Sequence, residues 1–169
     1  GTPVLGRRLK ARLPQGQPEG ATVGFAWLRD GVAIAGATGK VYRPTAADVA
    51  RQLSVRVTLA SAGYETTEVV AGASGPVMVE TTLEVRQSGR GGRAKVRARV
   101  VPVGLDGVPT GWLKIKVNQR KKRVSLRNGR RNATFVGFAR GRYPVVVRYF
   151  GDDVFLPARA LSEVRIRRG

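Results

Sequence analysis

The chain has 169 residues, of which 42% are hydrophobic, and its 31 basic side chains outnumber 11 acidic ones to give a formal charge of +20. Cysteine and histidine are both absent, which excludes cysteine nucleophiles, disulfides, histidine general bases and the usual zinc sites. The length and apolar content suffice to bury a hydrophobic core, in one domain or in two small ones.

Most of the charge lies in the second half of the chain. Residues 1–76 carry 9 basic and 5 acidic side chains, a net charge of +4, whereas residues 77–169 carry 22 and 6, a net charge of +16. No apolar run reaches the roughly 18 residues that a membrane span needs, so we expect no span. The chain does not begin with Met, and we interpret it as part of a longer protein.

The most informative stretch runs from residue 25 to residue 58. Phe25 and Trp27 share one face of an expected strand, and Asp30-Gly31 predicts a tight hairpin turn because glycine accepts positive φ. Residues 45–49 predict a corner between two sheets. Residues 53–58 then alternate apolar and polar side chains, which predicts a half-buried strand with Val55 and Val57 in the core. A buried early Trp, a corner with an Asp and an alternating strand are typical of an immunoglobulin-like sandwich.

The flanking segments complete this first half. We expect a first edge strand in residues 1–12, a loop at 15–20 and a last strand at 65–70. Residues 71–76 are small and polar and end in Pro76, which has no N–H to give to a sheet, so they predict an interdomain linker. The predicted domains are therefore 1–76 and 77–169.

The second half contains a series of short alternating segments. They lie at residues 83–85, 95–100, 113–117, 124–126, 133–135, 143–149 and 164–166. Turn signals recur about every 10 residues, at Asp106-Gly107, Asn128-Gly129 and Gly151-Asp152, as expected of a sandwich. Tyr143 and Tyr149 are assigned to the core, with Tyr143 at the position of a corner tyrosine. The sequence thus predicts an all-β fold of two tandem immunoglobulin-like β-sandwich domains.

Each half of the chain contains stretches that resemble a known bacterial domain. FAWLRDGVAI at 25–34, YRPTAAD at 42–48 and LSVRV at 53–57 resemble a bacterial Ig-like repeat of secreted and surface proteins of actinobacteria. PTGWLKI at 109–115 and GRYPVVVRYFGDD at 141–153 are similar to a second bacterial Ig-like family. The resemblance implies tandem stalks, spacers or adhesion modules outside the cell, without cofactors or catalysis. It also implies a more neutral composition than this chain has.

The basic residues of the second half are the candidate binding site. The densest run is Arg120, Lys121, Lys122 and Arg123, and it is expected to cluster with Lys114, Lys116, Arg127, Arg130 and Arg131. Lys95, Arg97 and Arg99 predict a second stripe. Such faces attract polyanions, here anionic cell-wall polymers or surface glycans, although a merely solvated face has the same pattern. Nucleic acid is disfavoured because no aromatic residues interleave with the basic run.

Asp152-Asp153 supplies two of the oxygen ligands that calcium needs, but we interpret it as a turn. We therefore expect no metal, no cofactor and no enzyme activity. The sequence favours a noncatalytic spacer, stalk or adhesion module of a larger secreted or cell-surface protein, monomeric within its longer chain. The alternative function is docking on a polyanion through the basic second domain.

Overall fold

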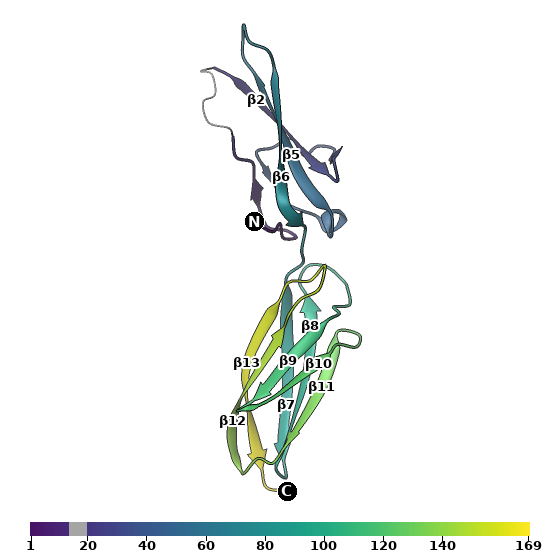
Figure 1. The fold of residues 1–169 in the computed structure, drawn as a ribbon, viewed down its shortest axis with the longest axis vertical. Coiled ribbons are helices and arrows are strands. Elements are labelled where there is room, and N and C mark those ends of the chain that lie inside the picture. The colour runs from purple at the N-terminus through teal and green to yellow at the C-terminus, as the bar shows by residue number, and fades with distance from the viewer. Residues whose placement is uncertain (14–19) are drawn as a thin grey trace. The chain divides into compact units, whose positions relative to one another are not determined.

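The computed structural model describes residues 1–13 and 20–169, and over this part of the chain it is almost entirely β-structure (Figure 1). The chain forms two compact units, Gly1–Met78 and Val79–Gly169. Because Val77 and Met78 are uncharged, the units keep the net charges of +4 and +16. The predicted loop at 15–20 lies outside the described residues except for Gly20.

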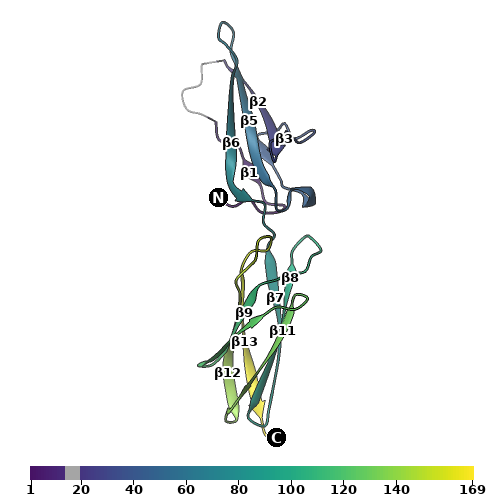
Figure 2. The same cartoon turned by 45° about the vertical axis from the view of Figure 1, so that its right-hand side comes forward.

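The first unit combines a four-stranded sheet with a two-stranded ribbon. Its elements are β1 (Leu9–Lys10), β2 (Thr22–Arg29), β3 (Val32–Ala33), β4 (Val41–Tyr42), the 3₁₀ helix η1 (Ala46–Asp48), β5 (Gln52–Ala60) and β6 (Thr67–Pro76). The sheet has the order β3-β2-β5-β6, and β1 pairs with β4 (Figures 1 and 2). All of these pairs are antiparallel.

The core of the first unit lies between the sheet and the ribbon, as the alternation predicts. Trp27, Val55 and Val57 are buried, and Phe25 and Tyr42 pack against them. The indole N–H of Trp27 donates to the Gly39 carbonyl at 2.8 Å, and its ring stacks on Tyr42 with centroids 5.5 Å apart. The Trp27 ring can therefore be buried without leaving its indole N–H unpaired, because this N–H has a hydrogen-bond acceptor.

The predicted turn and corner of this unit are confirmed. Asp30 and Gly31 connect β2 to β3 with φ of 47° and 84°, the left-handed conformation that a tight hairpin needs. Residues 46–48 form η1, which carries the chain from β4 in the ribbon to β5 in the sheet.

Two expectations for the first unit are wrong. The expected strand of residues 1–12 is limited to Leu9–Lys10, which pairs with β4. Residues 71–76, expected to be a linker, belong to strand β6 and pair with β5 up to Gln52 and Pro76. Small residues are tolerated there because β6 is an edge strand, where proline costs no ladder hydrogen bond.

The second unit is a sandwich of longer strands. They are β7 (Thr81–Arg90), β8 (Arg93–Pro102), β9 (Trp112–Val117), β10 (Arg120–Ser125), β11 (Arg130–Val136), β12 (Gly141–Tyr149) and β13 (Ala158–Arg167). The strand order is β10-β9-β12-β13-β7-β8-β11. Only the short pairing between β13 and β7, at Ile166 with Gly89 and Arg167 with Arg90, is parallel among the described strand pairs.

This order folds back on itself around a core. Strands from the two ends of the order lie in contact, namely β11 with β10 and with β9. Alternate side chains fill the core, such as Val96 and Val100 from β8 and Leu113 and Ile115 from β9, all nearly inaccessible to solvent. The predicted fold class, an all-β immunoglobulin-like sandwich, is confirmed.

Details of the second unit also follow the sequence. Asn128 and Gly129 adopt φ of 49° and 67° in the predicted hairpin turn. The Tyr143 hydroxyl donates to the Ala139 carbonyl four residues upstream at 3.2 Å, which is the geometry of a corner tyrosine. Tyr149 is buried as expected, and burial raises the pKa of its hydroxyl.

Candidate anion-binding surface

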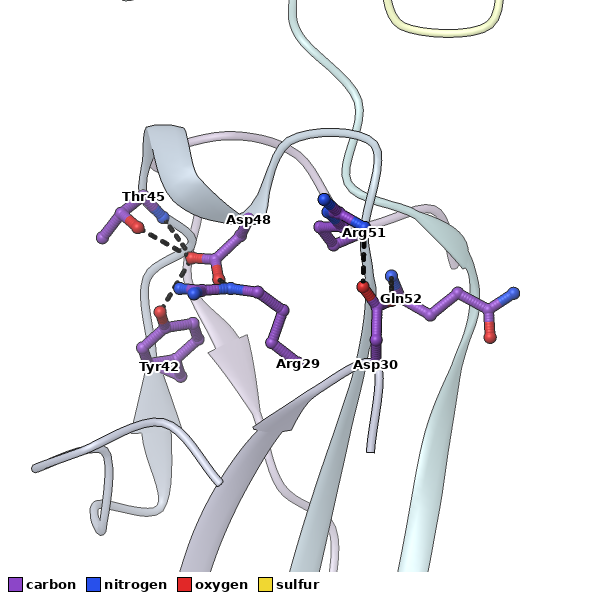
Figure 3. A network of polar contacts seen from close by, with 7 residues as sticks. All are labelled: Arg29, Asp30, Tyr42, Thr45, Asp48, Arg51 and Gln52. Atoms are coloured by element: carbon purple, nitrogen blue, oxygen red, sulfur yellow. Dashed lines mark hydrogen bonds and ion pairs between the residues drawn. The ribbon is translucent and has the colours of Figure 1, made fainter. Parts of the chain in front are cut away.

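A buried carboxylate in the first unit, that of Asp48, accepts a network of hydrogen bonds (Figure 3). Asp48 is wholly inaccessible to solvent. One carboxylate oxygen accepts from Arg29 Nε at 2.7 Å, and the other accepts from Tyr42 Oη at 2.8 Å, Thr45 N at 2.6 Å and Thr45 Oγ1 at 2.9 Å. The four bonds tie β2, β4 and η1 together, so this carboxylate holds the corner in place.

The electrostatics of Asp48 agree with a structural role. Burial by itself raises the pKa of this carboxyl, but the hydrogen bonds from Thr45, Tyr42 and Arg29 outweigh burial and hold the pKa below its usual value. The same carboxylate and burial raise the pKa of Tyr42. Asp48 therefore stays ionised at neutral pH, and because it is wholly inaccessible to solvent it is not placed to act as a base on a substrate.

Asp152 has the corresponding role in the second unit. Its Oδ2 accepts from Thr110 N and Thr110 Oγ1, both at 2.8 Å, and its Oδ1 accepts from Val154 N at 3.0 Å and Phe155 N at 2.8 Å. Burial by itself raises the pKa of the Asp152 carboxyl. The four hydrogen bonds lower this pKa by more than burial raises it, so the carboxyl titrates below its usual value. The residue anchors a turn to the loop before β9, whereas Asp153 is exposed.

The basic run of residues 120–123 is divided between two faces of β10. Lys121 lies opposite Lys116 of β9, and Arg123 lies opposite Lys114, so these two side chains are on the outer face of the sheet. Arg120 and Lys122 instead lie opposite Val117 and Ile115, which are buried. Because side chains alternate along a strand, the run does not present four adjacent charges.

The inward-facing pair contacts strand β11 and the residues that follow it. The Lys122 ammonium donates to the Thr134 carbonyl at 2.7 Å and lies 5.4 Å from the centroid of the Phe135 ring. The Arg120 guanidinium donates to the Gly137 carbonyl at 3.4 Å and lies 5.4 Å from the Phe138 ring. These cation–π contacts cover the edge of the core between β10 and β11.

The outward-facing charges form a row across four strands. Lys114 on β9 has Arg123 of β10 on one side and Arg148 of β12 on the other, and Arg148 lies opposite Arg159 of β13. We call Arg123, Lys114, Arg148 and Arg159 the cationic row. With strands about 4.8 Å apart, the row spans roughly 14 Å. Among the described residues, none of the four forms an ion pair with a carboxylate.

Exposed aromatic rings flank the cationic row, at the next outward-facing positions along its two middle strands, in β9 and directly after β12. Trp112 and Phe150 are 46% and 54% exposed and are joined by a backbone hydrogen bond. The Arg123 guanidinium lies over the Trp112 ring at 4.7 Å. Sequence reasoning missed Arg148, Arg159 and both rings as members of this face. Alternation along β9, β12 and β13 places these four side chains outward, but it does not say which strands are neighbours.

The remaining candidate residues lie elsewhere. Arg127 and Arg130 face each other across the Asn128-Gly129 turn. Arg130 also lies opposite Arg99 of β8, and Arg131 lies opposite Ala98. The nine residues expected to cluster therefore do not form one group. Lys114 and Arg123 are in the cationic row with Lys116 and Lys121 beside it, and the others lie on the inner edge of β10 or around the turn between β10 and β11 and along β11.

The part of the chain that the structure describes contains no group of three or more acidic, histidine or cysteine side chains that could hold a metal ion. None of its helices is long and apolar enough to cross a membrane.

No protein-family model and no curated protein matches the sequence. Among solved structures, the chain is similar to fibronectin(III)-like modules of CbhA from Clostridium thermocellum, at 11% identity and a TM-score of 0.42 over 99% of this chain and 89% of that one. It is similar to a bacterial ice-binding adhesin at 14% identity and a TM-score of 0.36, over 91% of this chain and 55% of that one. It is also similar to the N-terminal four Ig domains of Dscam1 at 14% identity and a TM-score of 0.38, over 98% and 42%.

This chain thus spans about half of the adhesin chain and less than half of the Dscam1 chain. Scores of this size carry no function from those proteins to this one. The fold assignment rests on the strand pairing and burial described above.

Proposed function

We propose that this chain is a noncatalytic extracellular module of a larger secreted or cell-surface protein, built from two tandem immunoglobulin-like domains with their boundary at residues 78 and 79. The observation that carries this proposal is the use of the two rigidly held carboxylates, Asp48 and Asp152. Each accepts four hydrogen bonds from groups of its own turn or corner and from neighbouring strands and loops, as expected where the residues serve the scaffold. The resemblance to actinobacterial Ig-like repeats supports the same role.

A second candidate function is favoured by the cationic row. Like charges directly opposite each other on a sheet destabilise it, and the row contains three such pairs in succession. A linear polyanion lying across the strands would neutralise them and release its counterions. We therefore propose that the second domain docks on anionic polymers of the cell wall, with Lys116 and Lys121 beside the row.

A matched pair of double variants separates docking from a passive spacer. Lys121→Glu with Arg123→Glu reverses two outward charges, and Arg120→Glu with Lys122→Glu reverses two inward ones with the same change in net charge. We expect the outward variant to weaken retention on purified actinobacterial cell walls by roughly tenfold or more at low salt. Its Tm should not fall, because the lost contact of Arg123 with Trp112 is offset by relief of the like-charge pairs with Lys114 and Lys116. We expect the inward variant to lower the Tm, because it loses two cation–π contacts and two hydrogen bonds.

The readouts are cosedimentation of the full chain with walls and thermal unfolding by circular dichroism. Equal loss of retention in both folded variants would show that only net charge matters, which argues against the row. No retention of the unmodified chain at low salt would leave the spacer function and remove the docking function.

A further inference from the structure

A second group of arginines lies on the outer face formed by β7, β8 and β11. Arg97 of β8 lies opposite Arg86 of β7 on one side and Asn132 of β11 on the other. One step along β8, Arg99 lies between Glu84 and Arg130. The inner faces of these strands carry the core, so this face points away from the one that holds the cationic row.

The arginines surround an open hollow of about 630 Å³. Its lining is formed by Glu84, Arg86, Arg97, Ala98, Arg99, Arg130, Arg131 and Asn132. Arg131 lies opposite the buried Ala98, so its side chain is on the inner face of β11. The other four guanidinium groups and one carboxylate give the outer-face lining a formal charge of +3. We call this the arginine hollow.

The arginine hollow is costly to the free protein. Arg86 with Arg97, and Arg99 with Arg130, are like charges directly opposite each other, an arrangement that destabilises a sheet. The ion pair between Arg99 and Glu84 is long, at 3.8 Å, and half exposed. It therefore offsets little of the repulsion between the arginines. Among the described residues, Arg86, Arg97 and Arg130 form no ion pair. Packing does not require them either, because their side chains are exposed.

The residue types define the chemistry of a ligand. Every cation in the hollow is arginine, whose planar fork binds two oxygens of a phosphate or carboxylate at once. A charge of +3 exceeds what one carboxylate neutralises, and it matches adjacent phosphate groups that carry several negative charges. We propose that the arginine hollow binds a linked phosphate group of the pyrophosphate or tripolyphosphate type. This proposal does not depend on docking by the cationic row.

The test is isothermal titration calorimetry of the full chain with sodium tripolyphosphate at low salt. We expect saturable binding of one tripolyphosphate in the hollow, weaker binding of pyrophosphate and still weaker binding of sulfate. Arg97→Gln should weaken tripolyphosphate binding roughly tenfold, which is the change in affinity expected when one hydrogen bond between charged groups is lost. Arg97→Lys, which keeps the charge and loses the fork, should weaken it severalfold.

Arg142→Gln is the matched control, because it removes one exposed arginine that belongs neither to the arginine hollow nor to the cationic row. We expect it to leave tripolyphosphate binding almost unchanged. Equal weakening by Arg142→Gln and Arg97→Gln, or full affinity in Arg97→Lys, would overturn the proposal in favour of unspecific charge attraction. Binding of single-stranded DNA without binding of tripolyphosphate would overturn it as well. Wall retention that is lost in the outward Lys121/Arg123 variant but not in Arg97→Gln distinguishes the two surfaces.

Discussion

Replacing Asp48 with alanine is expected to lower the free energy of unfolding of the first unit by about 3 kcal/mol. The substitution removes the acceptor of four hydrogen bonds at a site closed to solvent. It leaves the hydroxyl of Tyr42 and the N–H of Thr45 without this partner. The corner between β4 and β5 loses the group that holds it, so the ribbon should separate from the sheet early in unfolding.

The measurement is urea unfolding of the full chain, followed by fluorescence in a Trp112→Phe background. Trp27 is then the sole tryptophan and reports on the first unit, where its ring is buried against Tyr42. Glu68→Ala is the control, because Glu68 is exposed and its interactions are long, a 3.8 Å pair with Arg56 and a 3.5 Å hydrogen bond from the Thr58 hydroxyl. It should leave the transition almost unchanged. An Asp48→Ala transition that coincides with the control would show that the network does not stabilise the corner.

The pH dependence of the first unit follows from the same carboxylate. Its folded pKa lies below the unfolded value of 3.8, so its contribution is complete above that value and is lost as the pH falls through the folded pKa. We expect stability to decline below about pH 4. Asp48→Asn cannot titrate, so its unfolding free energy should be lower at pH 7 and should fall less steeply with acid. Parallel pH profiles for the two proteins would contradict this.

Replacing Gly89 with alanine is expected to destabilise the second unit by about 2 kcal/mol. A Cβ at this position would lie 2.5 Å from the Arg165 carbonyl oxygen and 2.6 Å from Ile166 Cδ1. The carbonyl belongs to the backbone of β13 where that strand pairs with β7, so it cannot move without disturbing the pairing. Glycine therefore allows β7 and β13 to approach closely.

Gly141→Ala in β12 is the matched control, because the nearest atoms to its added Cβ belong to the Tyr143 ring at an ordinary 3.6 Å. Hydrogen exchange of the full chain, resolved into peptides of the second unit, measures both variants. We expect faster exchange in β7 and β13 for Gly89→Ala and no such change for Gly141→Ala. Equal protection in the two variants would show that the close approach relaxes at no cost.

Local patterns in the sequence predict much of this fold because they reflect local physics. Alternation identifies the core strands, since a half-buried strand must alternate, and Trp27 and Val55 are buried accordingly. Asp30-Gly31 and Asn128-Gly129 predict their turns because the required φ angles favour these residues. The linker prediction at 71–76 fails because small residues and a terminal proline also fit an edge strand, which β6 is.

The candidate site was less accessible to sequence reasoning. Alternation alone separates Lys121 and Arg123 from Arg120 and Lys122, but only the pairing of β10 with β9 shows which pair faces the core. Arg148 and Arg159 join Lys114 from strands distant in the sequence. The Asp48 network depends on the same kind of long-range contact, because Arg29 precedes it by 19 residues.

The sequence by itself therefore determined the all-β class, the core positions, the main turns and the concentration of positive charge in the second half. The tertiary structure alone decided which charges lie side by side, which of them cover the core edge, and which carboxylates are buried and bonded. The physical reason is that side-chain periodicity is a property of one strand, whereas a surface is made by several. Strand order and register depend on packing across the whole sandwich, and no local pattern encodes them.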